Sequence, residues 1–357
     1  MSIDHSPIQS YLDAMIELGA SDLMLTANTP TRARVDGQLR PLPGERALTD
    51  EEVEQRILTM LSPGLREEFR EKQELDFSFS YDVSHRFRGN CFFQRGVPAL
   101  SLRALPTEIP DFESLHLPPV CEYFCNLPQG LVLVTGPTGS GKSTTLASMI
   151  DFINTNRECH ILTIEDPIEF VHQHKTAVVN QRQVGDDTSS FAGALRAALR
   201  EDPDVILVGE MRDPETIQFA LTLAETGHLV FATLHTNDAA QSLDRVWDVF
   251  PHQRQAQVRV QLSASLAGII SQRLVRRTTT GVVAAFEVLV ATPAVRNIIR
   301  EGNTHQLRNI IHGGRAHGMI TLEASLAERI DAGLISIDEA LTHTLYPNEV
   351  DELRRSA

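Results

Sequence analysis

The sequence has few cysteines, no long hydrophobic run and no excess of basic charge, and each absence excludes a class of protein. Its four cysteines include no Cys-x-x-Cys pair, which disfavours a zinc site or redox motif and favours free thiols in a reducing compartment. The longest uncharged stretch, residues 123–141, contains polar residues, proline and glycines, unlike the roughly twenty apolar residues of a membrane span. Residues 1–5 lack the features of a signal peptide. We therefore expect a cytoplasmic chain that meets a membrane only through a partner protein.

The charge balance is acidic, with 47 acidic and 32 basic residues and a formal net charge of −15. A negative chain has no global attraction for phosphate backbones, so no nucleic acid is expected as a partner. The 357 residues are 42% hydrophobic and 22% charged, which is typical of a folded protein with two or three domains.

Proline and glycine divide the chain into three blocks and a linker. Residues 1–105 combine a helical pattern near the start with alternating runs, which predicts a mixed sheet. Residues 106–120 are rich in proline, and we interpret them as the linker. Residues 121–290 alternate strand and helix signals, and residues 291–357 have a helical period.

The second block predicts an α/β fold. It contains four short, mainly apolar runs, at residues 131–135, 161–164, 205–208 and 229–234. Such runs are typical of strands that are buried on both faces of a largely parallel sheet. Between them, apolar residues recur at helical spacing within residues 191–199 and 217–224, which predicts helices that face the core.

The strongest functional signal is a glycine-rich loop between a predicted strand and a predicted helix, which matches the phosphate-loop pattern. It consists of Gly136, Pro137, Thr138, Gly139, Ser140, Gly141, Lys142, Ser143 and Thr144. Glycines allow successive backbone N–H groups to curl around a phosphate. In such loops the lysine reaches the β- and γ-phosphates and the following hydroxyl binds Mg²⁺, so we expect ATP and Mg²⁺ here, with Lys142 and Ser143 in these roles.

Polar residues follow the other apolar runs, at the strand ends that face the ligand crevice in open α/β sheets. Glu210 follows residues 205–208, and the acidic segment Glu165–Glu169 follows residues 161–164. Carboxylates gathered beside a phosphate loop suit metal and phosphate chemistry. His235 follows the fourth run, and two roles stay open for it: sensing the γ-phosphate or linking neighbouring strand ends.

Hydrolysis by phosphate-loop enzymes often requires an arginine from elsewhere, which contributes about 10³–10⁵ in rate. The first block offers four candidates in or beside predicted strands: Arg86, Arg88, Arg95 and Arg103. For any one of them alone, a solvated surface position is the simpler interpretation.

In combination these motifs resemble those of the secretion ATPases, and among them the type IV pilus retraction ATPases of twitching motility. Four boxes match in order, at residues 136–144, 165–169, 204–213 and 233–237. Residues 294–301 resemble the C-terminal signature of the retraction family, and two further similar segments lie at residues 19–23 and 318–321. The similarity covers nearly the whole chain.

The resemblance implies a PAS-like N-terminal domain, a RecA-like ATPase domain and a helical C-terminal part. It implies a homohexameric ring, peripheral to the inner membrane, that acts on the pilus platform protein, with a paralogous retraction ATPase as a further candidate partner. It implies that Glu210 and Glu169 are the catalytic acids, with Glu210 also near the Mg²⁺. N-terminal arginines would complete the site in trans or across a domain hinge.

Two features of the sequence depart from the main retraction pattern. Met24 occupies a position where family members commonly have histidine, and residues 169–175 look closer to the accessory retraction ATPases. The C-terminal signature favours the main motor, whereas extension and type II secretion ATPases fit less well because the tetracysteine zinc motif is absent.

Two alternatives come from other functional classes: a regulatory module that binds nucleotide without turnover, and a DNA translocase. The intact Glu169, Glu210 and His235 argue against the first. The net charge of −15 argues against the second.

Overall fold

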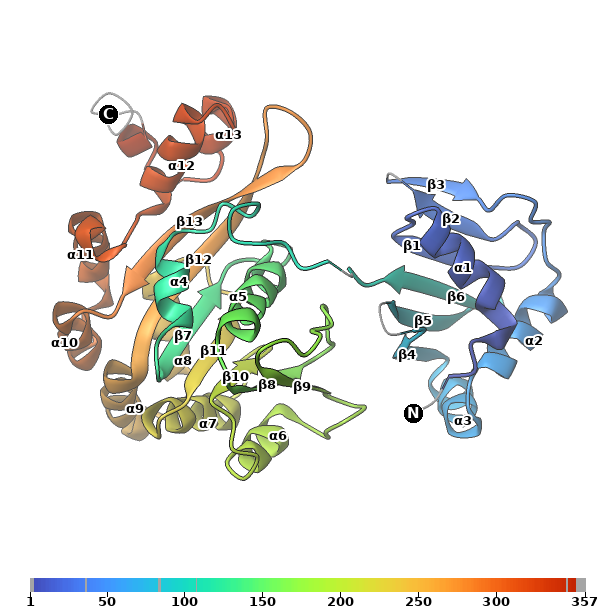
Figure 1. Cartoon of the computed structure of the whole chain (residues 1–357), viewed down its shortest axis with the longest axis horizontal. Helices are drawn as coiled ribbons and strands as arrows, with labels where there is room; N and C mark the ends of the chain where they lie inside the picture. Colours follow the sequence, from blue (N-terminus) through green and yellow to red (C-terminus); the bar gives the residue numbers. More distant parts are fainter. Residues whose placement is uncertain (1–2, 36, 83–84, 107, 345, 351–357) are drawn as a thin grey trace. The chain divides into compact units, whose positions relative to one another are not determined.

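The computed structural model describes residues 3–35, 37–82, 85–106, 108–344 and 346–350. The chain divides into two compact units, each with its own sheet and core (Figure 1). Unit 1 consists of residues 1–108 with 169–171, and unit 2 of residues 109–168 with 172–357.

Unit 1 is built on a six-stranded sheet in the order β3-β2-β1-β6-β5-β4, and all its neighbouring strands are antiparallel, so the expectation of a mixed sheet is wrong. Its strands are β1 (Asp22–Leu25), β2 (Arg32–Val35), β3 (Gln38–Pro41), β4 (Glu74–Ser80), β5 (Arg86–Gln94) and β6 (Val97–Ala104). Its helices are α1 (Gln9–Glu17), α2 (Asp50–Met60) and α3 (Pro63–Lys72). Helix α2 begins with a capping box of Thr49 and Glu52.

Unit 2 contains a seven-stranded sheet in the order β13-β12-β7-β11-β10-β8-β9, parallel except for β13. The strands are β7 (Gly130–Thr135), β8 (His160–Glu165), β9 (Val178–Gln183), β10 (Val205–Val208), β11 (Leu229–Leu234), β12 (Leu266–Arg276) and β13 (Val282–Val290). Strands β7, β8, β10 and β11 are the four predicted apolar runs, so the expected α/β fold is confirmed.

Helices cover both faces of this sheet, over two hydrophobic clusters. They are α4 (Val120–Cys125), α5 (Lys142–Asn156), α6 (Phe191–Ala198), α7 (Pro214–Glu225), α8 (Ala239–Asp248) and α9 (His252–Ser265). Helices α6 and α7 coincide with the two predicted amphipathic segments. Because the strands are parallel, the loops after β7, β8, β10 and β11 meet at one edge.

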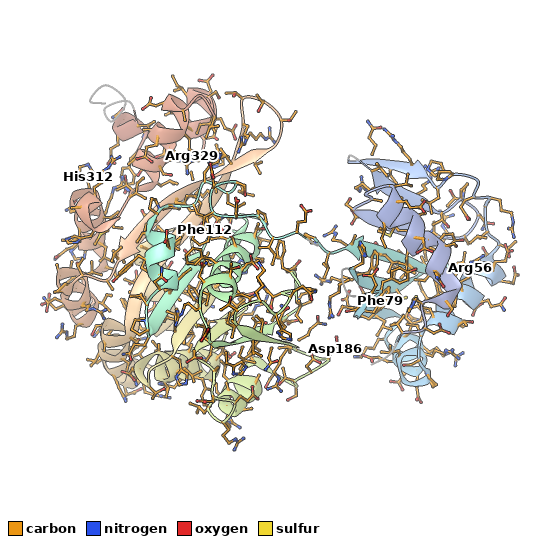
Figure 2. The ribbon with its side chains drawn as sticks, viewed as in Figure 1. Arg56, Phe79, Phe112, Asp186, His312 and Arg329 are labelled. Carbon is orange, nitrogen blue, oxygen red and sulfur yellow. The ribbon has the colours of Figure 1, made fainter. Side chains whose placement is uncertain are left out.

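The C-terminal part of unit 2 is helical, as its period predicts. It contains α10 (Pro293–Glu301), α11 (Leu307–Gly313), α12 (Leu322–Asp331) and α13 (Ile337–Leu341). Two residues labelled in Figure 2 fix the segment that precedes α4. Arg329 of α12 donates to the carbonyl of His116 at 2.9 Å, and Phe112 stacks on Phe152 with ring centroids 5.0 Å apart.

Two further features of the structure concern its cysteines and the length and polarity of its helices. All four cysteines are free thiols. Among the described residues, no helix is long and apolar enough to cross a bilayer.

Candidate active site

The glycine-rich loop joins the end of β7 to the start of α5, the context that the sequence predicts. Gly136, Gly139 and Gly141 have φ angles of 145°, 78° and 87°, in a region that side chains rarely adopt. A Cβ on Gly136 would lie 2.3 Å from the carbonyl oxygen of Gln272. The loop therefore needs glycine both for its backbone angles and for its close approach to β12.

Gln272 supports this loop from β12, and no motif in the sequence marks it. The side chain is 3% exposed and lies in the middle of the strand. Its Nε2 donates to the carbonyl of Ser140 at 2.7 Å, and its Oε1 accepts from Thr145 Oγ1 at 2.8 Å. One buried amide thus holds both the loop and the first turn of α5.

Lys142 is the first residue of α5 and is 8% exposed. Its Nζ donates to the carbonyls of Gly136 and Pro137 at 2.8 and 3.0 Å. Burial lowers the pKa of Lys142, and the nearby Glu210 carboxylate opposes this change. Ser143 follows at the first turn of the helix and is exposed, so its hydroxyl is accessible to a ligand.

A series of polar contacts connects the loop to the ends of β11 and β10. Thr138 Oγ1 lies 3.3 Å from His235 Nδ1, and His235 Nε2 lies 3.3 Å from Glu210 Oε2. Arg212 Nη2 donates to the same carboxylate oxygen at 2.6 Å. His235 therefore has the geometry of a link between strand ends, whereas its role in sensing phosphate stays a prediction.

Backbone bonds fix Glu210 between its neighbouring strands. The N–H of Gly209 donates to Ile164 of β8 at 2.8 Å, and the N–H of Met211 donates to Thr233 of β11 at 3.2 Å. The hydroxyl of Thr233 also donates to the carbonyl of Gly209. The parallel pairing thus continues beyond β10 and places the Glu210 backbone rigidly.

The charge of Glu210 is maintained by its partners. Burial raises the pKa of this carboxyl, but the hydrogen bond from Arg212 and the interaction with His235 outweigh it, so the pKa lies below its ordinary value. Arg212 belongs to a box that the sequence identifies, yet its pairing with Glu210 is visible only in the structure. Glu210 is therefore a carboxylate at neutral pH.

The acidic segment after β8 divides between two environments. Glu165 Oε1 accepts from Thr163 Oγ1 at 2.7 Å and from Gln181 Nε2 at 3.2 Å, which ties it to β9. Glu169 lies farther along, in irregular backbone, and is grouped with unit 1. Its role as a second catalytic acid stays a prediction.

The four candidate arginines lie in unit 1, in or beside β5 and β6. Arg86 donates to Ser78 Oγ at 2.8 Å, whereas Arg103 forms an ion pair of 2.8 Å with Asp22. Arg88 is exposed, and its backbone lies opposite that of Arg103 in the register of β5 and β6. Arg95 occupies the turn after β5, with a φ of 53°. Their catalytic role stays a prediction.

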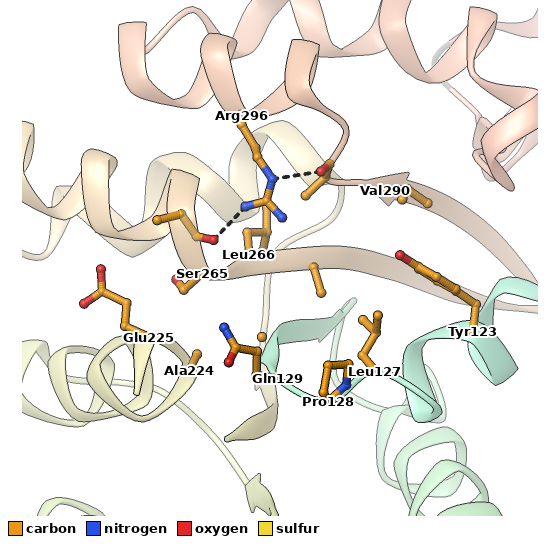
Figure 3. A pocket seen from close by; sticks show the side chains of 14 residues that line it. Tyr123, Leu127, Pro128, Gln129, Ala224, Glu225, Ser265, Leu266, Val290 and Arg296 are labelled. Carbon is orange, nitrogen blue, oxygen red and sulfur yellow. Dashed lines mark hydrogen bonds between the residues drawn. The ribbon is translucent and has the colours of Figure 1, made fainter. Parts of the chain in front are cut away.

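Two cavities in unit 2 differ in their relation to the loop. One of about 190 Å³ adjoins the start of α5 and is lined by Gly141, Thr144 and His116, among others. A larger one of about 520 Å³ lies at the opposite end of β7 (Figure 3). There the Arg296 guanidinium donates to the carbonyls of Ser263, Ala264 and Ala291, and it thereby caps the C-terminal end of α9. Of these two cavities, only the smaller one adjoins the glycine-rich loop.

The donor set near the loop suits a magnesium ion. Mg²⁺ prefers hard oxygen ligands and is usually held by one or two protein groups together with phosphate oxygens and water. The Ser143 hydroxyl and the Glu210 carboxylate are groups of this kind. Among the described residues, no cluster of three or more His, Cys, Asp or Glu could hold a metal ion.

Comparisons with known proteins agree with this geometry. The family model described as "Type II/IV secretion system protein" matches residues 5–342. The type IV pilus retraction ATPase PilT of Pseudomonas aeruginosa is 50% identical over 329 residues, 92% of this chain and 95% of that protein. The type IV pilus ATPase PilU of the same species is 40% identical over 343 residues, 96% and 90% of the two chains.

A solved structure extends the similarity to three dimensions. The crystal structure of the pilus retraction motor PilT with bound ADP is 48% identical and has a TM-score of 0.90. The match covers 97% of this chain and 99% of that one.

Proposed function

This chain belongs to the family of type II/IV secretion system proteins and is an ATPase, and on this premise we propose that it powers the retraction of type IV pili. The observation that carries the proposal is the contact of Glu210 with His235, and of His235 with Thr138, beside a complete phosphate loop. The similarity to a retraction ATPase over nearly its whole length supports the direction of the movement.

The loop binds the triphosphate of ATP. Backbone N–H groups of residues 136–144 and the Lys142 ammonium hold the β- and γ-phosphates, and the positive end of α5 adds to their attraction. Ser143 and Glu210 would hold Mg²⁺, which neutralises phosphate charge when bound. The cavity of about 190 Å³ beside Gly141 suits the nucleoside part.

Glu210 directs the attack of water. The water oxygen bonds to the γ-phosphorus while the bond from that phosphorus to the bridging oxygen breaks, and ADP leaves with the electron pair. The Glu210 carboxylate orients the water and accepts its proton, and His235 connects this event to the loop through Thr138. Glu169 is the second candidate for the base.

The active form is a homohexameric ring. We assign unit 1 as PAS-like and residues 121–290 as RecA-like, followed by a helical region at 291–357. One or more of the unit 1 arginines of a neighbouring copy supplies positive charge to the transferred phosphate. The ring is cytoplasmic, lies against the inner membrane through the pilus machine and acts on its platform protein.

A role as an accessory retraction ATPase is the second candidate function. It is favoured by residues 169–175, which look closer to the accessory retraction ATPases. The higher identity to PilT than to PilU, 50% against 40%, supports the main motor. A platform shared with a paralogous ATPase is compatible with either function.

Deletion of the gene tests the direction of the movement. Surface pili and twitching are scored in a piliated strain that carries it, with the intact gene and the Lys142→Ala gene returned separately. Excess pili without twitching, corrected only by the intact gene, are expected for a retraction motor. Loss of pili would instead indicate extension, and unchanged twitching would contradict the main-motor role.

A further inference from the structure

The turn before α4, residues 111–117, is packed against unit 2 through contacts that its sequence does not announce. The N–H of Leu117 donates to the carbonyl of Phe112 at 2.9 Å, which closes the turn. The Phe112 ring stacks on Phe152 of α5, with ring centroids 5.0 Å apart. His116 has a φ of 52°, in the left-handed region that a residue with a Cβ disfavours. A residue keeps this conformation only where its surroundings hold it.

Arg329 of α12 supplies that support and joins the turn to β13. Its Nη2 donates to the carbonyl of His116 at 2.9 Å, and its Nε donates to the carbonyl of Ala284, in β13, at 3.2 Å. A guanidinium is planar and its N–H groups have fixed directions, so the two bonds together fix how far apart the two carbonyls lie. Both bonds come from a charged donor and are therefore stronger than bonds between neutral groups.

Helix α12 places this guanidinium independently of the turn. Leu326 packs with Val283 and Ala285 of β13 in one hydrophobic cluster. Ser325 Oγ accepts the backbone N–H of Phe286, also in β13, at 3.0 Å. The helix is thus fixed to the strand by its own contacts, and Arg329 extends from this pair of elements to the turn.

The two segments that Arg329 joins both line the cavity of about 190 Å³ beside the glycine-rich loop. The lining includes residues 114–116 of the turn, residues 282–284 of the β13 segment, and Gly141 and Thr144 from the loop and the start of α5. Sites for small molecules are mainly apolar with a few polar groups, and the apolar side chains of the turn and of β13 suit the base of a nucleotide. Arg329 binds both segments but is not itself part of the lining.

We propose that Arg329 is a positioning residue for the nucleoside part of ATP: it holds the turn of residues 111–117 against β13 and thereby keeps the two walls of the cavity at the separation that admits the base. The inference rests on the proposed function, which assigns the nucleoside to this cavity. Arg329 acts through the carbonyls of His116 and Ala284 and not through the phosphates, which the glycine-rich loop binds. Its loss should therefore weaken the binding of a nucleotide without weakening the binding of a triphosphate chain.

Equilibrium binding of Mg-ATP and of magnesium tripolyphosphate to the full chain separates these two contributions. Arg329→Met removes the donors and keeps an unbranched side chain. This variant should bind ATP about tenfold more weakly than the wild type, because two hydrogen bonds are lost, and tripolyphosphate within about twofold. An unchanged affinity for ATP would overturn the proposal. An equal loss for both ligands would also overturn it, because such a loss reports general damage to the site.

Two further variants control this result. Arg315→Met removes an exposed ion pair of 2.7 Å with Glu328 of α12 and should bind both ligands as the wild type does. A loss of ATP affinity as large as that of Arg329→Met would attribute the effect to the helix and overturn the proposal. Arg329→Lys keeps the charge and the long stem but lacks the planar fork, so its loss of ATP affinity should be smaller, about threefold. If Arg329→Met does not fold, an unchanged ATP affinity in Arg329→Lys would overturn the proposal.

Turnover provides an independent readout. The base is bound alike before and during hydrolysis, so Arg329→Met should raise the KM for ATP about tenfold and leave kcat within about twofold. A lower kcat with an unchanged KM would contradict a role in binding the nucleoside. A wild-type protein that binds neither ligand would refute the proposed function itself, whereas ATP binding by the wild type that Arg329→Met retains in full would refute the role of Arg329 alone.

Discussion

In the proposed function, Lys142 is the residue on which nucleotide binding should depend most directly. Its ammonium is buried at the start of α5, bound to two loop carbonyls, and it lies near the Glu210 carboxylate. Such a group is prepared to exchange carbonyl oxygens for phosphate oxygens, which carry more negative charge.

Replacement of Lys142 by alanine should abolish hydrolysis and weaken binding of Mg-ATP. A ligand at a hundredfold excess over its Kd stabilises the folded protein by about 2.7 kcal/mol. Thermal melts should show this gain for the wild type and for Lys72→Ala, a change at an exposed lysine of unit 1, but not for Lys142→Ala. An equal gain in Lys142→Ala would remove the lysine from the binding site.

If Glu210 is the base, as proposed, Arg212 should set the acidic limit of activity through it. Its hydrogen bond to Glu210 lowers the pKa of that carboxyl, so the base stays ionised as the pH falls. Arg212→Ala should raise the Glu210 pKa, and the acidic limb of the pH–kcat profile should move to higher pH. The exposed Arg200→Ala should leave the limb in place. A limb that does not move in Arg212→Ala would show that another group controls it.

The sequence identifies the site residues that belong to a local pattern, and fails to identify those that act across the fold. The phosphate loop, Glu210 and His235 follow predicted strands, so their convergence at one edge is predictable. Gln272 is not, because its partners are more than a hundred residues away in the chain. A buried amide inside an apolar strand is a useful signal only when its partner is known.

At the scale of the element, the loop depends on glycines that serve different needs. Gly139 requires only a positive φ, since no atom lies within 4 Å of the place of a Cβ. Gly141 requires a positive φ and space as well, because its Cβ would lie 2.7 Å from Gln272 Nε2. A substitution at Gly139 therefore tests backbone strain alone, whereas a substitution at Gly141 tests backbone strain and packing together.

Gly139→Ala should destabilise the protein by about 1–2 kcal/mol, the cost of a left-handed residue with a Cβ. Gly141→Ala should cost more, because Gln272 must move away and lose about 0.5–1.5 kcal/mol for each displaced hydrogen bond. Urea denaturation of both variants measures the difference. Equal midpoints would show that Gln272 yields without loss, contrary to its proposed support of the loop.

The strands of unit 2 also differ in how well the sequence predicts them. Strands β7, β8, β10 and β11 are buried on both faces, and their mainly apolar sequence predicts them. Strand β12 is also largely buried, but Ser271 and Gln272 interrupt its apolar pattern. Their hydroxyl and amide groups are satisfied by Thr135 and Ser140, which are distant in sequence. In β12, hydrogen bonds to residues distant in sequence accommodate the buried polar side chains, so the strand lacks the continuous apolar pattern that would predict it.

At the scale of the whole molecule, the account requires several copies of the chain. Unit 1 carries the candidate arginines and unit 2 the phosphate loop. An arginine that acts in trans belongs to a different copy from the loop that it serves. Arg103 is already paired with Asp22 and Arg86 with Ser78, which makes the exposed Arg88 and Arg95 the better candidates.

Mixed rings test whether the arginine acts in trans. Alanine at each of the four arginines should yield at least one variant that assembles and binds ATP but barely hydrolyses it. Mixed with Lys142→Ala copies, that variant should regain phosphate release, because some interfaces then combine an intact loop with an intact arginine. Activity no greater than the sum of the separate proteins would indicate an arginine in cis, and full turnover by all four variants would exclude these residues.

Single-turnover hydrolysis by Glu210→Gln, measured beside equilibrium binding of a fluorescent ATP analogue, tests most directly whether Glu210 drives hydrolysis at this site. The amide keeps the size of the side chain but loses its basicity, which contributes about 10²–10⁴ in rate. Hydrolysis should fall by that factor, binding should change little because Lys142 and the loop are intact, and Glu169→Gln should be the less damaged variant. A Glu210→Gln protein that hydrolyses ATP within about threefold of the wild type would contradict the assignment of the base.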